Sequence, residues 1–360
     1  AASDVYKRQT QNYKLVFSKG SEGTQTYVSA NYMGDEGVID KNSYERYSAK
    51  ANIKISMAKW LDVTVDLNAS HGVGKGIGGL EMSGYNPLWI AFNSSPTMTM
   101  TDKNGYYNWD PYGTIQANAY GIIAASESER RRDVFSGHID LKFNIIKGLT
   151  FTSSNGVDYY NNTSYSFTPQ SVNGAGKNSM GNSNLQRMLL QSSNNITYNH
   201  TWNDKHYLTV TGVWEATKST IRNMGISGSS LQAESVGWWD VKNAVTRDAT
   251  NGYSDWALLS GVGRVIYNYD NRYMLTGTFR ADGSSRFTND KWGYFPSVAV
   301  AWTASNESFM ESTRDLISNL KIRASYGVIG NQDIDPYSTL AILNTTTTYF
   351  GNSSGVTGYW

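Results

Sequence analysis

The sequence predicts an all-β fold, in which an antiparallel up-and-down meander of about twelve strands forms part of a transmembrane β-barrel. Three observations predict it: segments of alternating apolar and polar residues, an aromatic-rich composition, and connections that alternate between short and long. The 360 residues include 25 Tyr, 11 Trp, 11 Phe and 34 Gly but only 6 Pro. This composition is typical of a large β protein with polar, glycine-rich loops.

The clearest strand is the stretch LDVTVDLNAS at 61–70, in which every odd-numbered residue is apolar and every even-numbered residue is polar. Because side chains of a strand point alternately to its two faces, one face of this strand is apolar and the other polar. The pattern recurs at 47–57, 139–145 and 320–328 and, more weakly, at 12–19, 23–33, 149–160, 185–199, 206–217, 257–268, 272–282 and 295–304. Most of these segments reach the roughly 9–11 residues that a membrane-crossing strand needs, whereas soluble strands have about five or six.

The connections between these segments fall into two classes that alternate along the chain. The short ones are AKW (58–60), IKG (146–148), WNDK (202–205) and YDNR (269–272), and the long ones are 34–44, 72–130, 161–184, 218–256, 283–294 and the residues from 331 onward. A membrane barrel has this asymmetry, with short turns on one rim and long loops on the other. One connection on the short rim, 305–319, differs, and Phe309, Met310 and Leu316 predict a short amphipathic helix there, capped by Ser305 or Asn306.

The composition excludes several classes of protein. The net charge of +1 gives no electrostatic case for a nucleic-acid partner. The chain has no cysteine, hence no disulfide or thiolate chemistry. Alternation alone leaves two possibilities for the apolar face, since a soluble sandwich would cover it with a second sheet and a barrel would expose it to lipid. The alternative function is therefore a surface-exposed β-rich binding or adhesion protein without a channel.

Two stretches are more specific than the pattern: FRADGSSRFTNDKWGYFPSVAVAW at 279–302 and LKIRASYGVIGNQDIDPY at 320–337. They resemble the SusC/RagA family of TonB-linked outer-membrane transporters. The segments 11–39 and 45–63 resemble the same family, so the resemblance covers nearly the whole chain in the right order. The signature residues are Arg280, Asp282, Gly283, Arg286, Phe287, Trp292, Pro296, Arg323, Tyr326, Gly330 and Asn331. We expect them to have a structural role, with Asp282-Gly283 as a tight turn and Pro296 at the start of its strand.

The resemblance implies a barrel of roughly 22 strands with a plugged lumen in the outer membrane of a Bacteroidetes-like Gram-negative cell. It also implies import of oligosaccharides or peptides together with a SusD-like surface lipoprotein, driven by the TonB complex through the plug. The chain departs from the family because no plug or TonB box precedes its strands and because 344–360 reads as an external loop. We therefore expect residues 10–360 to be a barrel truncated at both ends, and 1–9 to be non-native sequence from adapter read-through, the alternative for 1–9 being a divergent linker after the plug.

The long loops are the candidate cargo-binding surface. Aromatic faces stack on sugar rings, and the candidate ligand-binding residues are Trp89, Trp109, Tyr112, Trp238 and Trp239. The alternative is that these rings fold the loops on themselves or contact the lipoprotein. The four histidines are scattered without a cysteine or carboxylate cluster, and no nucleophile or phosphate-binding motif occurs, so we expect no metal, no cofactor and no enzymatic activity.

Overall fold

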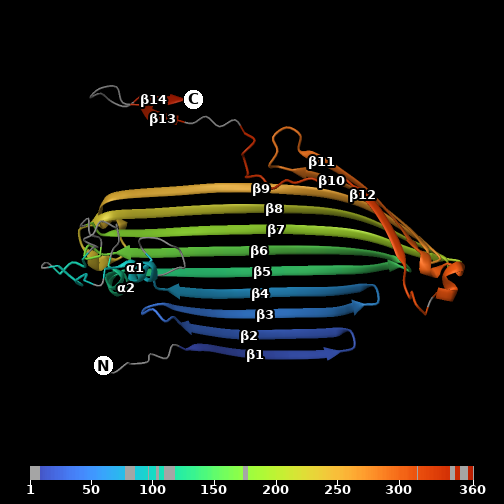
Figure 1. Ribbon diagram of the computed structural model, residues 1–360, viewed down its shortest axis with the longest axis horizontal. Coiled ribbons are helices and arrows are strands. Elements are labelled where there is room, and N and C mark those ends of the chain that lie inside the picture. The colour runs from blue at the N-terminus through green and yellow to red at the C-terminus, as the bar shows by residue number, and fades with distance from the viewer. Residues whose placement is uncertain are drawn as a thin grey trace. The chain divides into compact units, whose positions relative to one another are not determined.

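The computed structural model describes residues 9–77, 86–95, 97–102, 105–108, 118–172, 177–313, 315–340, 345–348 and 356–359. Within this described part, β1 to β12 form one sheet in which each strand pairs with its neighbours along the chain (Figure 1). The predicted all-β meander is therefore confirmed. Its strands are β1 (Thr10–Ser21), β2 (Thr24–Glu36), β3 (Ser43–Ala58), β4 (Leu61–Lys75), β5 (Glu127–Ile146), β6 (Leu149–Thr168), β7 (Ser179–Trp202), β8 (His206–Leu231), β9 (Ala244–Tyr269), β10 (Tyr273–Ser284), β11 (Trp292–Thr303) and β12 (Lys321–Gly327).

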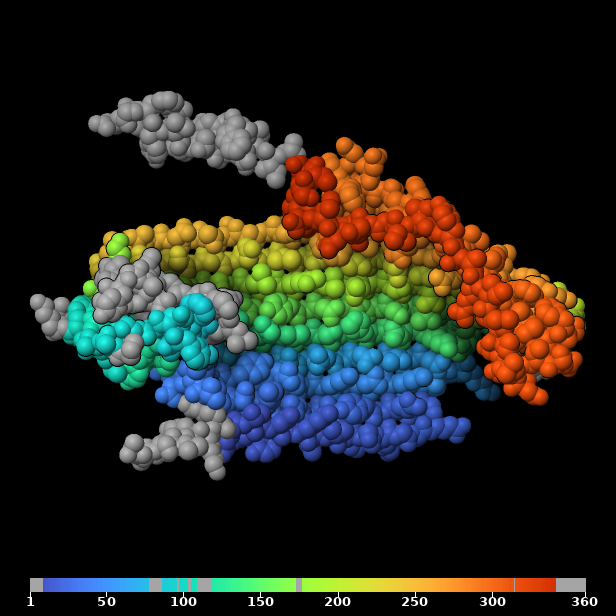
Figure 2. All heavy atoms as spheres, in the orientation of Figure 1, coloured from blue at the N-terminus to red at the C-terminus, as the bar shows by residue number. Residues whose placement is uncertain are grey.

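The chain forms two compact units, one of 1–196 with 217–255 and the other of 197–216 with 256–360. Strands β1 to β6 belong to the first unit and lie side by side in chain order (Figures 1 and 2). Strands β10 to β12 belong to the second unit, while β7, β8 and β9 contribute residues to both. The predicted non-native segment lies outside the described residues except for Gln9, whose carbonyl accepts a hydrogen bond from the Glu36 amide.

The register of β4 with β5 places the two kinds of side chain on opposite faces of the sheet. Val63 lies opposite Leu141 and Val65 opposite Ile139, whereas Asp62 lies opposite Lys142. Directly opposed residues of an antiparallel pair share a face, so one face is apolar and the other carries charges. The polar face also carries hydrogen bonds such as that from the Ser56 hydroxyl to the Asp62 carboxylate, at 2.6 Å.

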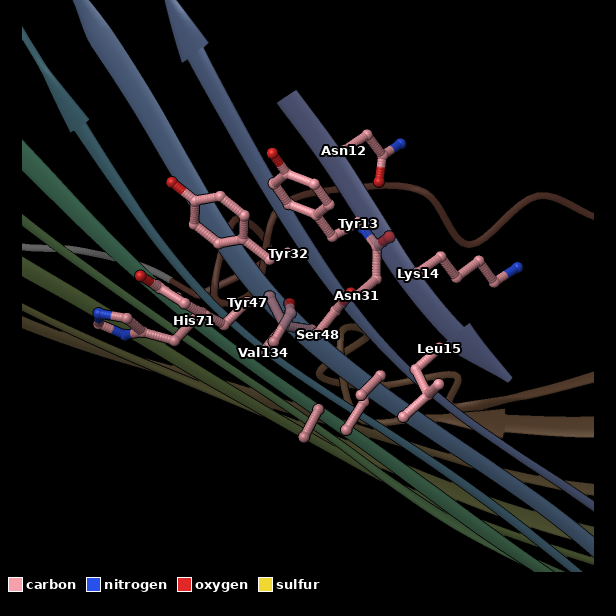
Figure 3. A pocket seen from close by; sticks show the side chains of 14 residues that line it. Asn12, Tyr13, Lys14, Leu15, Asn31, Tyr32, Tyr47, Ser48, His71 and Val134 are labelled. Atoms are coloured by element: carbon pink, nitrogen blue, oxygen red, sulfur yellow. The ribbon is translucent and has the colours of Figure 1, made fainter. Parts of the chain in front are cut away.

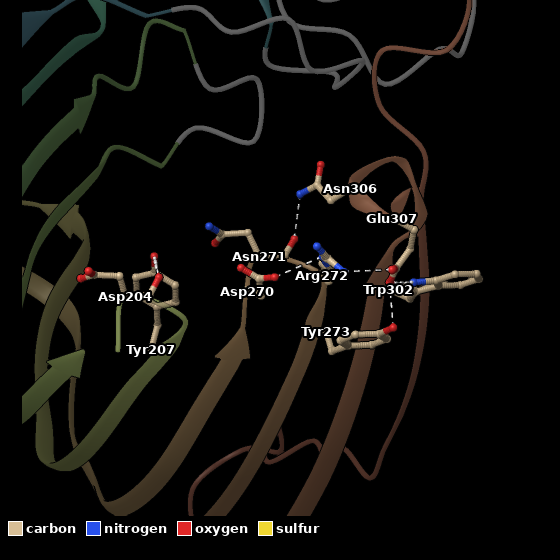
Figure 4. Close-up of polar contacts among 9 residues, drawn as sticks. All are labelled: Asp204, Tyr207, Asp270, Asn271, Arg272, Tyr273, Trp302, Asn306 and Glu307. Atoms are coloured by element: carbon tan, nitrogen blue, oxygen red, sulfur yellow. Dashed lines mark hydrogen bonds and ion pairs between the residues drawn. The ribbon is translucent and has the colours of Figure 1, made fainter. Parts of the chain in front are cut away.

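The predicted short connections are confirmed, and two of them have the backbone that tight hairpins require. Asn203 and Asp204 have φ angles of 51° and 50°, and Asp270 and Asn271 have 51° and 53°. Positive φ at both central residues defines the type I′ turn, whose twist matches the strands, and Asn and Asp tolerate it. Figure 4 shows the second turn, where Arg272 forms an ion pair with Asp270 at 3.2 Å.

Two predicted long loops, 161–184 and 218–256, are wrong in extent. The structure continues β6 to Thr168, begins β7 at Ser179, ends β8 at Leu231 and begins β9 at Ala244. The apolar alternation fades in these extensions, but the backbone ladder continues, because hydrogen bonding between strands does not depend on side-chain polarity. The strands thus reach 26 residues, far more than a bilayer requires.

The predicted amphipathic helix at 305–319 is also wrong. The segment contains two short 3₁₀ helices, η3 (Ala304–Asn306) and η4 (Ser308–Thr313). Phe309 and Leu316 are 64% and 88% exposed, so no apolar surface holds a longer helix in place. Asn306 does not cap it, because its side chain donates to the Asn271 carbonyl at 3.0 Å (Figure 4).

Small elements follow the long-loop ends of the strands. They are α1 (Pro87–Asn93), α2 (Ala119–Ala125), η1 (Glu234–Val236) and η2 (Val241–Asn243). Asn86 and Asn118 cap α1 and α2 by accepting backbone N–H bonds, and Ile90, Ile122 and Val172 form a small buried cluster. The region expected to be an external loop contains a hairpin of β13 (Thr345–Thr348) and β14 (Val356–Tyr359). No helix among the described residues has the length and apolar character needed to cross a membrane.

Candidate functional site

The apolar face is exposed along the strands. Leu15 and Phe17 on β1 are 76% and 59% exposed, and Leu67 in the middle of β4 is 41% exposed. Buried apolar side chains of the described residues lie instead near strand ends and in connections: Ile90, Ile122, Phe167, Val172, Met180, Leu231, Ala244 and Ala304. A soluble protein rarely leaves so long a run of large apolar side chains uncovered.

A shallow trough of about 950 Å³ lies on this apolar face (Figure 3). Its floor is Ala30, Ala49 and Ala69, three small residues opposed in register on β2, β3 and β4. Tyr13, Tyr32 and Tyr47 stand along one side, and neighbouring rings stack or tilt at 6.2 and 5.0 Å between centroids. The trough thus belongs to the exposed apolar face and not to the polar side of the sheet.

The polar face has a separate pocket of about 560 Å³ at the long-loop end of β4 and β5. Arg130 and Arg132 line it, and they lie opposite Gly74 and Gly72 of β4. Both arginines are exposed, and within the described part of the chain neither forms an ion pair. The Arg132 guanidinium lies 5.6 Å from the centroid of the Tyr160 ring. Our sequence analysis missed this pair, although the run ERRRD at 129–133 contained its signal.

The intervening arginine has the opposite environment. Arg131 points to the other face, where its Nε donates to Glu129 at 2.6 Å and its guanidinium lies 5.4 Å from the Tyr165 ring centroid. Asp133 lies on that same face and accepts from His71, with 2.6 Å between Nδ1 and Oδ1. The acidic residues of this run therefore pair on one face and leave the two arginines of the polar face without a carboxylate.

The five aromatic candidates do not form one site. Trp109 and Tyr112 lie outside the described residues, and Trp89 is half-buried on α1. Trp238 and Trp239 both contact Tyr165, at 5.8 and 5.7 Å between ring centroids. Trp238 also packs against the buried cluster of Phe167, Met180, Leu231 and Ala244, so it folds the β8–β9 connection. Trp239 is 69% exposed.

The signature residues Arg280 and Asp282 form an ion pair on the polar face. The Arg280 Nε lies 2.8 Å from both carboxylate oxygens of Asp282, and its Nη2 is 3.1 Å from the Ser260 hydroxyl. Glu215 approaches the same guanidinium at 3.7 Å. Residues i and i+2 of a strand share a face, which explains the Arg-x-Asp spacing of the motif.

Arg286, in the connection between β10 and β11, forms hydrogen bonds with the segment that follows β12. Its Nη1 donates to the carbonyls of Gln332 and Ile334 at 3.2 and 2.9 Å and to the Asp333 carboxylate at 3.2 Å. The guanidinium also lies 4.6 Å from the centroid of the Trp256 ring, and the side chain is only 14% exposed. Asn331 shapes the receiving loop, because its side-chain oxygen accepts from the Asp333 amide at 2.8 Å.

Two predictions about the signature are wrong. Asp282-Gly283 is not a turn, since both residues lie within β10 opposite Gly293 and Trp292. A Cβ on Gly283 would come 3.0 Å from the Trp292 indole, so the glycine makes room for that ring. Pro296 does not begin β11 but lies within it. Its carbonyl accepts a hydrogen bond from the Val328 amide, one residue beyond the last pair of β11 with β12, Ser297 and Gly327. Its missing N–H therefore falls where that ladder ends.

The remaining signature residues are placed as follows. Gly330 packs against Phe295, where an added Cβ would lie 2.4 Å from a ring atom. Trp292 and Tyr326 are 50% and 74% exposed on the apolar face. Arg323 lies opposite Ala301 on the polar face, and the Phe287 amide donates to the Ser284 carbonyl at 3.4 Å.

Histidines do not converge in the described part of the chain. His206 contacts the Tyr267 hydroxyl at 2.7 Å, and His71 contacts Asp133. No group of three or more His, Cys, Asp or Glu side chains there has the geometry of a metal site.

Comparison with known proteins identifies relatives over most of the chain, although no protein-family model matches. "TonB-dependent receptor P3" of Formosa agariphila is 28% identical over 92% of this chain and 34% of its own length. "TonB-dependent receptor SusC" of Bacteroides thetaiotaomicron is 26% identical over 92% of this chain and 35% of its own length. The chain thus spans about a third of these curated relatives.

The same fold occurs in solved structures of the RagAB peptide transporter. One, described as the "closed-closed" state of a peptide importer, superposes with a TM-score of 0.79 at 20% identity, over 98% of this chain and 40% of that one. Another gives a TM-score of 0.75 at 22% identity. The predicted resemblance is thus confirmed by sequence relatives and by fold. The chain is therefore similar in sequence to TonB-dependent receptors, SusC among them, and has the fold of part of the RagAB peptide transporter.

Proposed function

We propose that the protein imports oligosaccharides or peptides across the outer membrane as the channel subunit of a pair with a SusD-like surface lipoprotein, driven by TonB. The observation that carries this proposal is the uncovered apolar face of the long antiparallel strands. Large apolar side chains at 41–76% exposure, such as Leu15, Phe17 and Leu67, are stable in a bilayer and unfavourable in water.

The polar face supports the same proposal. Asp62 and Lys142 lie on the polar face of β4 and β5, and Arg280 lies on that of β10; burying such residues in a dry core would cost several kcal/mol for each unpaired charge. A water-filled passage removes that cost. The long-loop end of this face would then meet the cargo first, as in other outer-membrane barrels.

The alternative of an adhesion protein without a channel has less support. Such a protein would cover the apolar face with a second sheet or with helices. In the described residues the only other sheet is the two-stranded hairpin of β13 and β14, and the helices have seven residues or fewer. The small buried clusters lie near strand ends and do not form a core along the strands.

Residues that contact cargo or lipoprotein are part of the proposal. Trp239, exposed next to Trp238 and Tyr165, is a candidate for either contact. Trp89, Trp109 and Tyr112 belong to the long connection between β4 and β5 and remain candidates from the sequence. For Trp238 we propose a structural role, because it packs against the Phe167 cluster.

The decisive experiment is uptake by the native bacterium. A deletion strain and its complemented parent are supplied with fluorescently labelled tetrasaccharides or tetrapeptides, with and without a protonophore. We expect uptake of one cargo class in the complemented strain only, and its loss with the protonophore. A tagged receptor should co-purify with a lipoprotein encoded beside it. Equal uptake of both classes by the deletion and complemented strains would refute the proposal.

A further inference from the structure

The pocket of Arg130 and Arg132 has the composition of an anion-binding site. We propose that it is a subsite for a negatively charged sugar residue, a uronic acid or a sulfated sugar, of an oligosaccharide cargo. This inference rests on the proposed function and specifies its cargo. An arginine presents a planar set of N–H donors that matches a carboxylate or sulfate in two parallel hydrogen bonds.

The charges of the pocket are unbalanced. Arg130, Arg132 and Lys75 line it, and Glu127 is the one acidic residue among its lining residues. Four other arginines have carboxylate partners at 2.6–3.2 Å, namely Arg131, Arg272, Arg280 and Arg286. The two polar-face arginines therefore have donors available that no neighbouring carboxylate of the described chain occupies.

The strand opposite leaves room for an aromatic side chain beside the guanidinium groups. Gly72 and Gly74 face Arg132 and Arg130 across the ladder, and neither presents a side chain to the pocket. The Tyr44 side chain occupies this room and lies against both glycines: its nearest ring atoms are 3.4 Å from a Cβ built on Gly72 and 3.6 Å from one built on Gly74. The resulting volume of about 560 Å³ is within the usual range of small-molecule sites, and a flat aromatic surface borders it.

The surrounding groups favour a glycan over an acidic peptide. Arg130 and Arg132 are flanked on β6 by Ser164 and Asn162, their direct cross-strand partners. Ser166 and Thr168 also line the pocket, with Ile77 as its one large aliphatic side chain. Hydroxyl and amide groups suit sugar hydroxyls, and the Tyr44 ring suits the C–H face of a sugar. A peptide would need apolar recesses for its side chains.

The test is isothermal titration calorimetry on the purified protein, expressed in full and kept in detergent. The probes are tetragalacturonate, a sulfated carrageenan tetrasaccharide, neutral maltotetraose and tetraglutamate. The test variant is Arg130→Gln with Arg132→Gln. Its matched control is Arg131→Gln, which removes the adjacent arginine of the opposite face. We expect the test variant to weaken binding of one acidic tetrasaccharide about tenfold or more and the control to leave it unchanged. Raising the salt concentration should weaken that binding in the parent protein.

Comparison of the two acidic tetrasaccharides distinguishes a carboxylate from a sulfate ligand. Unchanged affinity in the test variant, or an equal loss in the Arg131→Gln control, would overturn the proposal. Preferential binding of tetraglutamate would also overturn it in favour of an acidic peptide. If the glutamine variant does not fold, the variant Arg130→Lys with Arg132→Lys replaces it. This variant keeps both positive charges but loses the planar guanidinium groups, so full affinity of the lysine variant would contradict bidentate recognition. If cells took up neutral oligosaccharides and the substitutions of Arg130 and Arg132 had no effect on binding, this subsite alone would be refuted. If cells took up no cargo at all, the proposed function would be refuted.

Discussion

Arginines occur in two contrasting environments in this protein. In the signature region Arg280 contacts Asp282 and Ser260, and Arg286 contacts Trp256 and three oxygens of the loop at 332–334. On β5, Arg130 and Arg132 are exposed and form no ion pair in the described part of the chain. The first pair holds strands and connections together, while the second has donors available for a ligand.

Strand parity produces this difference. Arg280 and Asp282 are two residues apart, so both point to the polar face and pair there. In the run at 129–133, Glu129, Arg131 and Asp133 share one face, and Arg130 and Arg132 share the other. The local charge of a sequence segment therefore does not indicate whether its arginines are neutralised. The face to which each residue points decides that.

An arginine placed on the apolar face should have the largest effect, because it has neither a partner nor water there. We expect Val65→Arg to destabilise the inserted protein by about 2–4 kcal/mol if residue 65 lies near the bilayer midplane. Asn68→Arg, on the polar face, is the matched control and should be mild. The measurement is urea unfolding in lipid vesicles. Equal stability of the two variants would contradict the assignment of the faces.

Removal of a paired arginine should have the next largest effect. Arg286→Ala removes the contact with Trp256 and three hydrogen bonds, so we expect a loss of about 2–3 kcal/mol in unfolding free energy. Arg130→Ala removes an arginine that forms no ion pair in the described part of the chain and should change stability by less than about 0.5 kcal/mol. Urea unfolding of both variants checks this, and similar losses would show that pairing does not distinguish the two regions.

The loop that receives Arg286 can be disturbed without changing any charge. Gly330→Ala would place a Cβ 2.4 Å from the Phe295 ring, and we expect a cost of about 1–2 kcal/mol from the forced shift. Gly277→Ala is the control, since no atom lies within 4 Å of a Cβ there. Proteolysis between 327 and 335 should accelerate in the first variant only. If Gly277→Ala were equally sensitive, loss of backbone freedom and not the contact with Phe295 would be responsible.

The sheet could be predicted from the sequence because apolar and polar residues alternate with the period of two at which the side chains of a strand change face. The segment 61–70 lies within β4, and the short turns were found as the short gaps between alternating segments. Strand ends were underestimated, since β8 and β9 continue to 26 residues where their side chains no longer alternate. The contacts of Arg286 with 332–334 join residues about 46–48 positions apart, which no local pattern specifies. The free arginine pair could have been predicted, because parity places Glu129 and Asp133 on the opposite face.

The smallest expected effect concerns Arg272, which lies at the end of the sheet with the short connections. Its Nη1 donates to Glu307 at 3.2 Å, and Glu307 also accepts from the Tyr273 hydroxyl at 2.7 Å and the Trp302 indole at 3.1 Å (Figure 4). These hydrogen bonds, that from Tyr273 first, lower the pKa of Glu307 below its ordinary value of 4.5. A carboxyl whose pKa is lower in the folded state stabilises that state fully above its ordinary pKa, and the stabilisation is lost as pH falls through the lowered value.

We therefore expect η3 and η4 to stay protected above the ordinary carboxyl pKa and to loosen as the pH falls through the lowered pKa of Glu307. Amide hydrogen exchange of 304–313, corrected for the intrinsic pH dependence of exchange, measures this. Glu307→Gln retains one acceptor oxygen and does not titrate, so its protection should be lower at neutral pH and show no step in acid. The same acid step in both variants would assign the transition to another group. A step in the parent alone would show that the contacts of Arg272 on this rim depend on the charge of the Glu307 carboxylate.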